Sequence, residues 1–269
     1  MTGESRKGAG KGAEAFAEFV RIVHRLRAPD GCPWDREQTP ASLKPFIVEE
    51  AYEVIDAIDG GGPEDLREEL GDLLLQIVLQ AEIADEAGDF DIDSVARGIS
   101  AKLVNRHPHV FGGERVDGSG EVLRNWEQIK RVEKKDRGLF DGLPSFLPAL
   151  LKASRMGEKA GRVGFDWTDA GEVRAKVDEE LAELDGAVAA GDPEAVEHEL
   201  GDLLFALAQW ARHLGRNPEE SLRAGCDRFA RRFARMDGDL RRRGARMDRL
   251  DIEELEQAWQ RAKRSEGEE

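Results

Sequence analysis

Two groups of acidic residues recur along this chain at a constant separation. The first group is Glu49, Glu50, Glu53, Glu69 and Asp72, and the second is Glu179, Glu180, Glu183, Glu199 and Asp202. Each acid of the second group lies 130 residues after its counterpart in the first. Each group contains acids three or four residues apart, a spacing that places side chains on one face of a helix. Carboxylates gathered in this way could bind a divalent cation.

The segment between the two halves of each group predicts a tight connection between antiparallel helices. In the second copy, Gly191 can end one helix, Asp192 can cap the next, and Pro193 suits its first turn. Such a hairpin brings four acids of one copy together. The repeat therefore predicts two homologous domains, each with an acidic cluster on a helical hairpin.

The residues that follow the acids indicate which cation would bind. The segments Leu73–Leu79 and Leu203–Ala208 are apolar on almost every side, which is typical of a buried helix. Carboxylates at the head of a buried helix lose solvation and repel one another unless a cation is present. Because oxygen ligands without nearby cysteine or paired histidine favour hard cations, we expect Mg²⁺ or Mn²⁺.

Basic residues of the second copy could bind the phosphates of a substrate. Magnesium in proteins commonly shares its coordination with phosphate oxygens. Lys176 lies one turn before Glu180, and the further candidates are Arg228, Arg231, Arg232 and Trp259, whose ring offers a stacking face for a base. The first copy has Phe46 at the position of Lys176. We therefore expect a nucleotide or another polyphosphate as substrate, held more fully by the second domain.

Together these motifs resemble those of the MazG-type nucleoside triphosphate pyrophosphohydrolases. The resemblance runs from about residue 15 to 264 and includes three further segments: Gly31–Thr39, Arg106–Phe111 and Val163–Trp167. Other all-α pyrophosphohydrolases share versions of the acidic motif. Its tandem repetition, together with the segment at 31–39, is similar to the two-domain MazG branch.

The resemblance implies Mg²⁺-dependent hydrolysis of an NTP to NMP and diphosphate by a homodimer. It implies that the metal ligands of the second domain are Glu180, Glu183, Glu199 and Asp202, with Glu50, Glu53, Glu69 and Asp72 at the matching positions of the first. It further implies that the nucleotide is contacted by Lys176, Arg228, Arg232 and Trp259, with Arg231, Glu180 and Asp202 as additional candidates. The C-terminal copy is usually the active one in this branch, in agreement with Phe46 replacing the lysine.

The expected mechanism is attack by a metal-bound water on the phosphate chain. Glu179 or another acid of the cluster would orient or deprotonate this water, a role that spacing alone does not assign. Specificity is expected to be broad, as in a house-cleaning enzyme. Two alternatives stay open: a narrow dNTP pyrophosphatase, and a non-catalytic nucleotide-binding regulatory dimer.

Composition limits the partners and the compartment. The net charge of −16 argues against nucleic acid as a general ligand, because non-specific binding needs a basic surface. Cys32 and Cys226 lack Cys-x-x-Cys spacing, which favours a reducing cytoplasm. The sequence contains no apolar run near ~20 residues and no signal peptide, so we expect no membrane contact.

The periodicity predicts an all-α protein with four parts. These are a disordered tail over 1–13, a first domain over 14–135, a linker over 136–145 and a second domain over 146–269. After an amphipathic start at Phe16–Leu26, we expect helices at about 40–58, 63–88, 92–106, 120–135, 145–160, 169–190, 193–214, 218–243 and 251–265. One hairpin cannot cover both faces of Leu73–Leu79, so we expect dimers that resemble four-helix bundles.

Overall fold

The structure is a computed structural model that describes residues 3–118, 120–122, 125–126, 129 and 138–265. Every regular element within these residues is a helix, and no strand occurs among them. The chain divides into two compact units, Met1–Lys135 and Asp136–Glu269. The prediction of an all-α protein with two tandem helical domains is confirmed.

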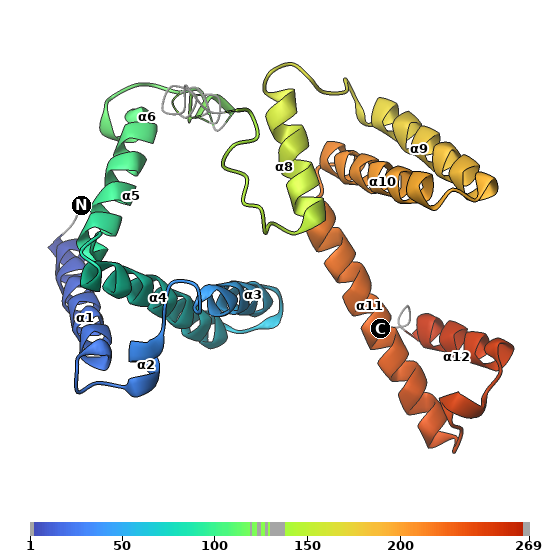
Figure 1. Ribbon diagram of the computed structural model, residues 1–269, viewed down its shortest axis with the longest axis horizontal. Coiled ribbons are helices and arrows are strands. Elements are labelled where there is room, and N and C mark those ends of the chain that lie inside the picture. Colours follow the sequence, from blue (N-terminus) through green and yellow to red (C-terminus); the bar gives the residue numbers. More distant parts are fainter. Residues whose placement is uncertain (1–2, 119, 123–124, 127–128, 130–137, 266–269) are drawn as a thin grey trace. The chain divides into compact units, whose positions relative to one another are not determined.

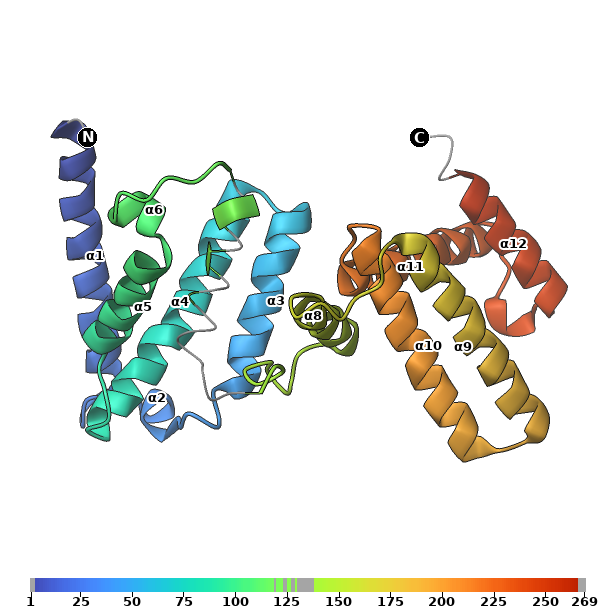
Figure 2. The same ribbon diagram turned by 90° about the horizontal axis from the view of Figure 1, so that it is seen from above.

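The first unit is organised around an antiparallel pair of helices. In Figures 1 and 2, α3 (Lys44–Gly60) and α4 (Pro63–Glu86) lie side by side. The other described elements are α1 (Gly3–Arg27), α2 (Pro33–Glu37), α5 (Ile92–Arg106) and α6 (Pro108–Phe111). The core of this unit consists of Val23, Leu43, Val78 and Leu79, which join α1, the start of α3 and α4.

The N-terminal segment differs from the sequence prediction. Because α1 begins at Gly3, residues 3–13 are helical, which corrects the expectation of a disordered tail over 1–13. This stretch contains no proline and continues into the amphipathic segment from Phe16 to Leu26. A helix that is already nucleated can extend through glycine at a modest cost per residue.

The second unit repeats the hairpin. Helices α9 (Ala170–Ala190) and α10 (Pro193–His213) lie side by side, and α8 (Ala149–Gly161) packs against α10 (Figures 1 and 2). The remaining elements are α11 (Pro218–Arg242), a 3₁₀ turn at Met247–Arg249 and α12 (Ile252–Ser265). Of the expected helices, only the one at about 120–135 falls largely outside the described residues.

The connection between α9 and α10 forms as the sequence predicts. Gly191 adopts φ 67°, a left-handed conformation that ends α9 without the strain a side chain would cause. The Asp192 carboxylate accepts the backbone N–H groups of Glu194 and Ala195 at 3.1 and 3.2 Å, and Pro193 starts α10. These local signals set the antiparallel register of the hairpin.

The apolar segments after the acids are only half buried. Val78 and Leu79 are buried, but Leu74 and Ile77 are 37% and 45% exposed. In the second unit, Leu204 and Leu207 are exposed as well. The expectation of a buried helix therefore holds for one face within a single chain, because a hairpin covers only one side of each helix. Within the described ranges, each helix is too short or too polar to cross a bilayer.

Candidate metal and phosphate site

The acids of the second unit converge on the space between α9 and α10. Carboxylate oxygens of Glu180, Glu183 and Glu199 all lie within 4.8 Å of one another. Glu180 is buried, at 5% exposure, whereas Glu183 lies on the exposed side of the cluster. Loss of solvation raises the pKa of Glu183, and the charges of Glu180 and Glu199 raise it further. The three carboxylates therefore lie in an environment that favours a positive partner.

Lys176 supplies one positive charge at the edge of this cluster. Its Nζ lies 2.6 Å from Glu180 Oε1 and 3.0 Å from Glu179 Oε1. Hydrogen bonds to these two carboxylates raise the pKa of Lys176, so the ammonium stays charged at neutral pH. An ammonium has three donors, and one of them can turn to a phosphate oxygen while another stays on Glu180.

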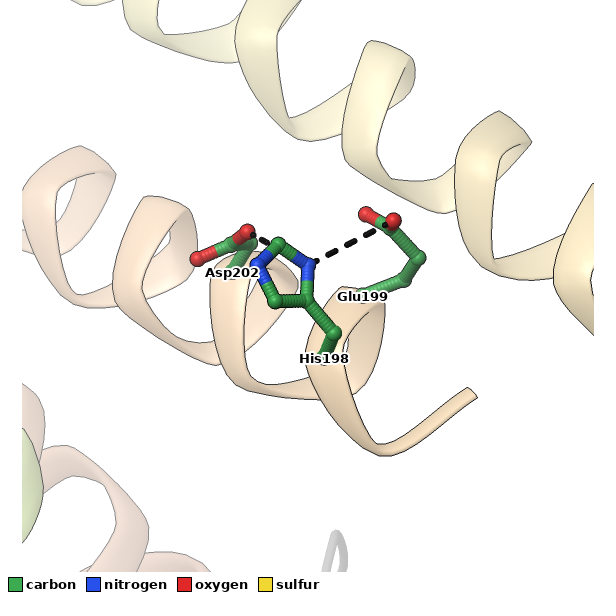
Figure 3. Close-up of side chains that lie close together, drawn as sticks. All are labelled: His198, Glu199 and Asp202. Atoms are coloured by element: carbon green, nitrogen blue, oxygen red, sulfur yellow. Dashed lines mark ion pairs between the residues drawn. The ribbon is translucent and has the colours of Figure 1, made fainter. Parts of the chain in front are cut away.

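His198 joins the acids of α10, which the sequence did not predict as a contact. Its Nδ1 lies 3.5 Å from Glu199 Oε1 and 3.3 Å from Asp202 Oδ2. Figure 3 shows the imidazole between the two carboxylates. The signal in the sequence is the four-residue spacing from His198 to Asp202, which puts both on one helix face. Asp202 itself is about half exposed, at 51%.

The first unit forms a matching cluster from α3 and α4. Carboxylate oxygens of Glu50, Glu53 and Glu69 lie within 4.8 Å of one another. Loss of solvation raises the pKa of Glu50, and the next largest cause is the charge of Asp72. Loss of solvation also raises the pKa of Glu69, and the charge of Glu53 is the next largest cause. The structure therefore brings together three of the four ligands predicted for the first domain, and the charge of Asp72 acts on Glu50.

In the first unit, the position equivalent to Lys176 is occupied by Phe46, which has a different role. Phe46 packs against the core of Val23, Leu43, Val78 and Leu79, and Trp34 meets its ring edge-on at a centroid distance of 6.0 Å. An aromatic side chain that belongs to the core replaces the ammonium beside the acids. The interpretation of the first copy as the poorer phosphate binder rests on this exchange.

The arginines and the tryptophan predicted to bind substrate lie on other helices. Arg228, Arg231 and Arg232 belong to α11, and Trp259 belongs to α12. Trp259 packs against Phe229 at a centroid distance of 5.1 Å and against the small core around Met236 and Leu240. Figure 1 shows α11 leading away from the α9–α10 hairpin, with α12 beside its distal part. These four residues therefore lie on helices other than the two that carry the acids of the second unit.

A further polar cluster holds the segment that precedes α9. Asp166 accepts hydrogen bonds from Arg212 at 2.9 and 2.5 Å, and its Oδ1 lies 3.0 Å from His213 Nε2. The bonds from Arg212 are the main cause that lowers the pKa of Asp166 to about 2. The sequence gives no local signal for this cluster, because 47 residues separate His213 from Asp166.

The donor set of the acidic clusters fits a hard divalent cation. Each cluster offers three carboxylate oxygens in mutual reach, and Mg²⁺ and Mn²⁺ prefer oxygen ligands of this kind. Cys32 and Cys226 are free thiols, and neither belongs to a cluster found among the described residues. Both clusters therefore have the oxygen ligands that could hold a metal ion of this kind.

Comparison with known proteins agrees with this chemistry. The model of the MazG nucleotide pyrophosphohydrolase domain matches the chain twice, at residues 38–111 and 171–236. The nucleoside triphosphate pyrophosphohydrolase of Escherichia coli is 45% identical over 254 residues, which cover 92% of this chain and 97% of that protein. A protein of Thermotoga maritima, named nucleoside triphosphate pyrophosphohydrolase/pyrophosphatase MazG, is 44% identical over 250 residues, or 92% of this chain and 95% of that protein.

Proposed function

Because the chain belongs to the MazG family of nucleotide pyrophosphohydrolases, we propose that it hydrolyses nucleoside triphosphates to NMP and diphosphate, with broad base specificity. The observation that carries this proposal is the convergence of Glu180, Glu183 and Glu199 within 4.8 Å, with Lys176 at their edge. Three acids and one cation match the needs of a metal-bound phosphate chain. We assign turnover to the second unit.

We propose separate roles for the residues of the second cluster in binding the metal, binding phosphate and activating water. Glu180, Glu183, Glu199 and Asp202 would hold Mg²⁺ or Mn²⁺. Lys176 would keep Glu180 in place and donate to a phosphate oxygen. The bound cation would neutralise phosphate charge and acidify a water. Glu179 is exposed and lies beside the cluster, so we assign it the orientation or deprotonation of that water.

We propose that the active form is a homodimer. Leu200, Leu204 and Leu207 are exposed and share one face of α10, and this face can be buried by a second copy. The basic residues Arg228 and Arg232 lie on α11, and this helix leads away from the α9–α10 hairpin (Figure 1). A second copy could bring them to the acidic cluster, since opposite charges would meet there.

The dimer proposal has a direct test by mixing two inactive variants. Glu180→Gln removes an acid and Arg228→Glu removes a predicted phosphate contact, so each homodimer should lose activity. If one site uses residues of both chains, the mixed dimer has one intact site, and an exchanged mixture should recover about a quarter of the normal rate. If the exchanged mixture recovers no activity, each chain forms its site from its own residues alone.

The remaining parts of the proposal concern substrate range and compartment. The free thiols of Cys32 and Cys226 fit a reducing environment, and we place the enzyme in the cytoplasm. A narrow dNTP pyrophosphatase or a nucleotide-binding regulator would use the same acids. The full set of predicted acids in both copies disfavours the regulator, because a protein that only binds nucleotide could lose an acid. Base preference separates the narrow pyrophosphatase from the broad one.

The proposed reaction can be tested by phosphorus NMR. The purified chain would be incubated with the four common NTPs and Mg²⁺, with an EDTA sample as control. We expect NMP and diphosphate in equal amounts from all four bases, and neither product with EDTA. Formation of NDP and orthophosphate would contradict the proposal, and so would the absence of turnover. Turnover of a single base would establish the narrow alternative.

A further inference from the structure

A cavity lined by arginines lies between α11 and α12 of the second unit. It has a volume of about 420 Å³, which falls in the range of small-molecule sites. Figure 1 shows α12 beside the distal part of α11, and residues of both segments form the walls. The charged residues among them are Arg235, Asp239, Arg242, Arg243 and Arg261. Four positive charges and one negative charge therefore line this arginine cavity.

Three of the arginines share the single carboxylate of Asp239. Its Oδ2 lies 3.0 Å from Nε of Arg243 and 4.0 Å from Nε of Arg261. Its Oδ1 lies 3.8 Å from a terminal nitrogen of Arg242. One carboxylate compensates the charge of one guanidinium, so two of the three positive charges remain in excess within this group. An anion that enters the cavity would reduce the repulsion between the guanidinium groups.

Arg261 has a hydrogen-bond donor without an acceptor. Its Nε is buried and forms no hydrogen bond with any residue that the structure describes, since the Asp239 carboxylate at 4.0 Å is too distant for one. A buried donor left unpaired costs free energy. The side chain as a whole is 37% exposed and lines the cavity, so an acceptor in the cavity can reach its guanidinium.

The other walls of the cavity offer little to a base or a sugar. They consist of Ala234, Met236, Gly238, Ala258 and Ala262, and the described lining residues include no aromatic ring, hydroxyl or amide side chain. Guanidinium groups bind phosphate oxygens through paired hydrogen bonds. A single carboxylate is a poor ligand set for a divalent cation. This chemistry favours a compact polyphosphate that binds without a metal ion.

The arginine cavity is distinct from the arginines predicted to bind substrate. Arg242 lies 14 residues after Arg228 and ten after Arg232, which corresponds to about 21 and 15 Å along α11. Neither Arg228 nor Arg232 lines the cavity. The sign of its charge is also opposite to that of the whole chain, whose net charge is −16. The cavity is therefore a separate candidate site.

From these observations we propose that the arginine cavity is a second anion site, which binds a compact polyphosphate without a metal ion. Inorganic tripolyphosphate and diphosphate belong to this class, and diphosphate is also a product of the proposed reaction. The inference goes beyond the proposed function, because binding in the cavity requires neither the acidic clusters nor turnover. The chain would then bind phosphate through a metal ion on the α9–α10 hairpin and through arginines alone between α11 and α12.

The test is a calorimetric titration of the full chain with tripolyphosphate in EDTA, which removes metal ions from the acidic clusters. Arg242→Gln removes one charge from the cavity, and Arg241→Gln is its matched control. Both arginines lie at the end of α11, are 75% and 76% exposed, and pair with an aspartate of the same helix. Of the two, Arg242 lines the cavity and Arg241 does not. Arg261→Gln removes a less exposed charge.

We expect saturable binding by the normal chain with a Kd below about 1 mM. Arg242→Gln should weaken binding about fivefold and Arg261→Gln about tenfold, since each removes a charge-assisted hydrogen bond to phosphate. Arg241→Gln should leave binding unchanged. Asp239→Asn should strengthen it, because the carboxylate that competes for the same arginines is lost. Diphosphate should bind more weakly through the same residues, since it carries less charge.

Absence of saturable binding would overturn the proposal. An equal loss in Arg241→Gln would overturn it as well, because binding would then follow the surface charge of α11 rather than the cavity. Arg228→Gln tests the rival site, and a loss confined to that variant would assign the anion to the predicted substrate arginines. Circular dichroism checks the folding of each variant. If Arg261→Gln does not fold, the comparison of Arg242→Gln with Arg241→Gln decides the outcome.

Failure of this proposal and failure of the proposed reaction are separate results. If the chain hydrolyses no NTP but binds tripolyphosphate in EDTA, and Arg242→Gln weakens that binding, the reaction is wrong and the cavity assignment stands. If the chain hydrolyses NTPs but binds no tripolyphosphate in EDTA, the cavity assignment is wrong and the reaction stands.

Discussion

The two acidic clusters carry the same carboxylates but differ in what surrounds them. In the second unit, Lys176 pairs with Glu180 at 2.6 Å, and His198 lies beside Glu199 and Asp202. In the first, Phe46 belongs to the core, and the position of His198 is held by another acid, Glu68. A repeated ligand set therefore need not mean repeated phosphate binding, because Phe46 offers no charge at the position where the second unit has Lys176.

The strongest test of this difference removes one acid from each cluster. Glu180→Gln should lower kcat/KM about 100- to 1,000-fold, since a lost ligand removes several kcal/mol of charge stabilisation. Glu50→Gln should retain most of the activity, as measured by release of diphosphate from ATP. Equal losses in the two variants would show that both clusters contribute to turnover and would end the assignment to the second unit.

The exchange of Lys176 for Phe46 can be tested through folding stability. Phe46→Ala should lower the free energy of unfolding of the first unit by about 2 kcal/mol, less than the cost at a fully buried site because the ring is only half-buried. Lys176→Ala should change the stability of the second unit by less than about 1 kcal/mol, as expected for a partly exposed ion pair. Urea unfolding followed by circular dichroism measures both. A large loss in Lys176→Ala would mean that the lysine is structural.

Low pH should decrease the folding stability of the second unit, because Asp166 then becomes protonated. Its pKa is about 2 in the folded chain, against 3.8 for the ordinary group. A lowered folded pKa adds stability that is present above pH ~4 and is lost as the pH falls towards ~2, amounting to about 2 kcal/mol. Asp166→Asn should remove that pH dependence and lower the stability at neutral pH. Unchanged acid unfolding in this variant would show that the contacts with Arg212 and His213 contribute little.

The smallest expected effect concerns the lysine in catalysis. Lys176→Met keeps most of the side-chain volume and removes the charge. It should lower kcat/KM for ATP about tenfold, since one charge-assisted hydrogen bond to phosphate is lost. Lys176→Arg should recover part of the loss, because it keeps the charge. Activity unaffected by Lys176→Met would remove the main reason for ranking the second cluster above the first.

Local patterns predicted the helices well because caps and turns act over a few residues. The expected helix at 92–106 matches α5, and that at 193–214 ends one residue beyond α10. Gly191, Asp192 and Pro193 fix the hairpin without help from distant parts of the chain. The prediction is wrong for residues 3–13, which extend the amphipathic helix that the sequence predicts from Phe16, because glycine weakens a helix without preventing it.

The sequence by itself determined the acids, their repeat and the hairpins that bring them together, because helix periodicity and capping are local properties. Only the tertiary structure decided what surrounds them. The contacts of Asp166 with Arg212 and His213 join segments that are far apart in the sequence. Their formation depends on how α8, α9 and α10 pack, since contacts between distant segments leave no periodic pattern in the chain.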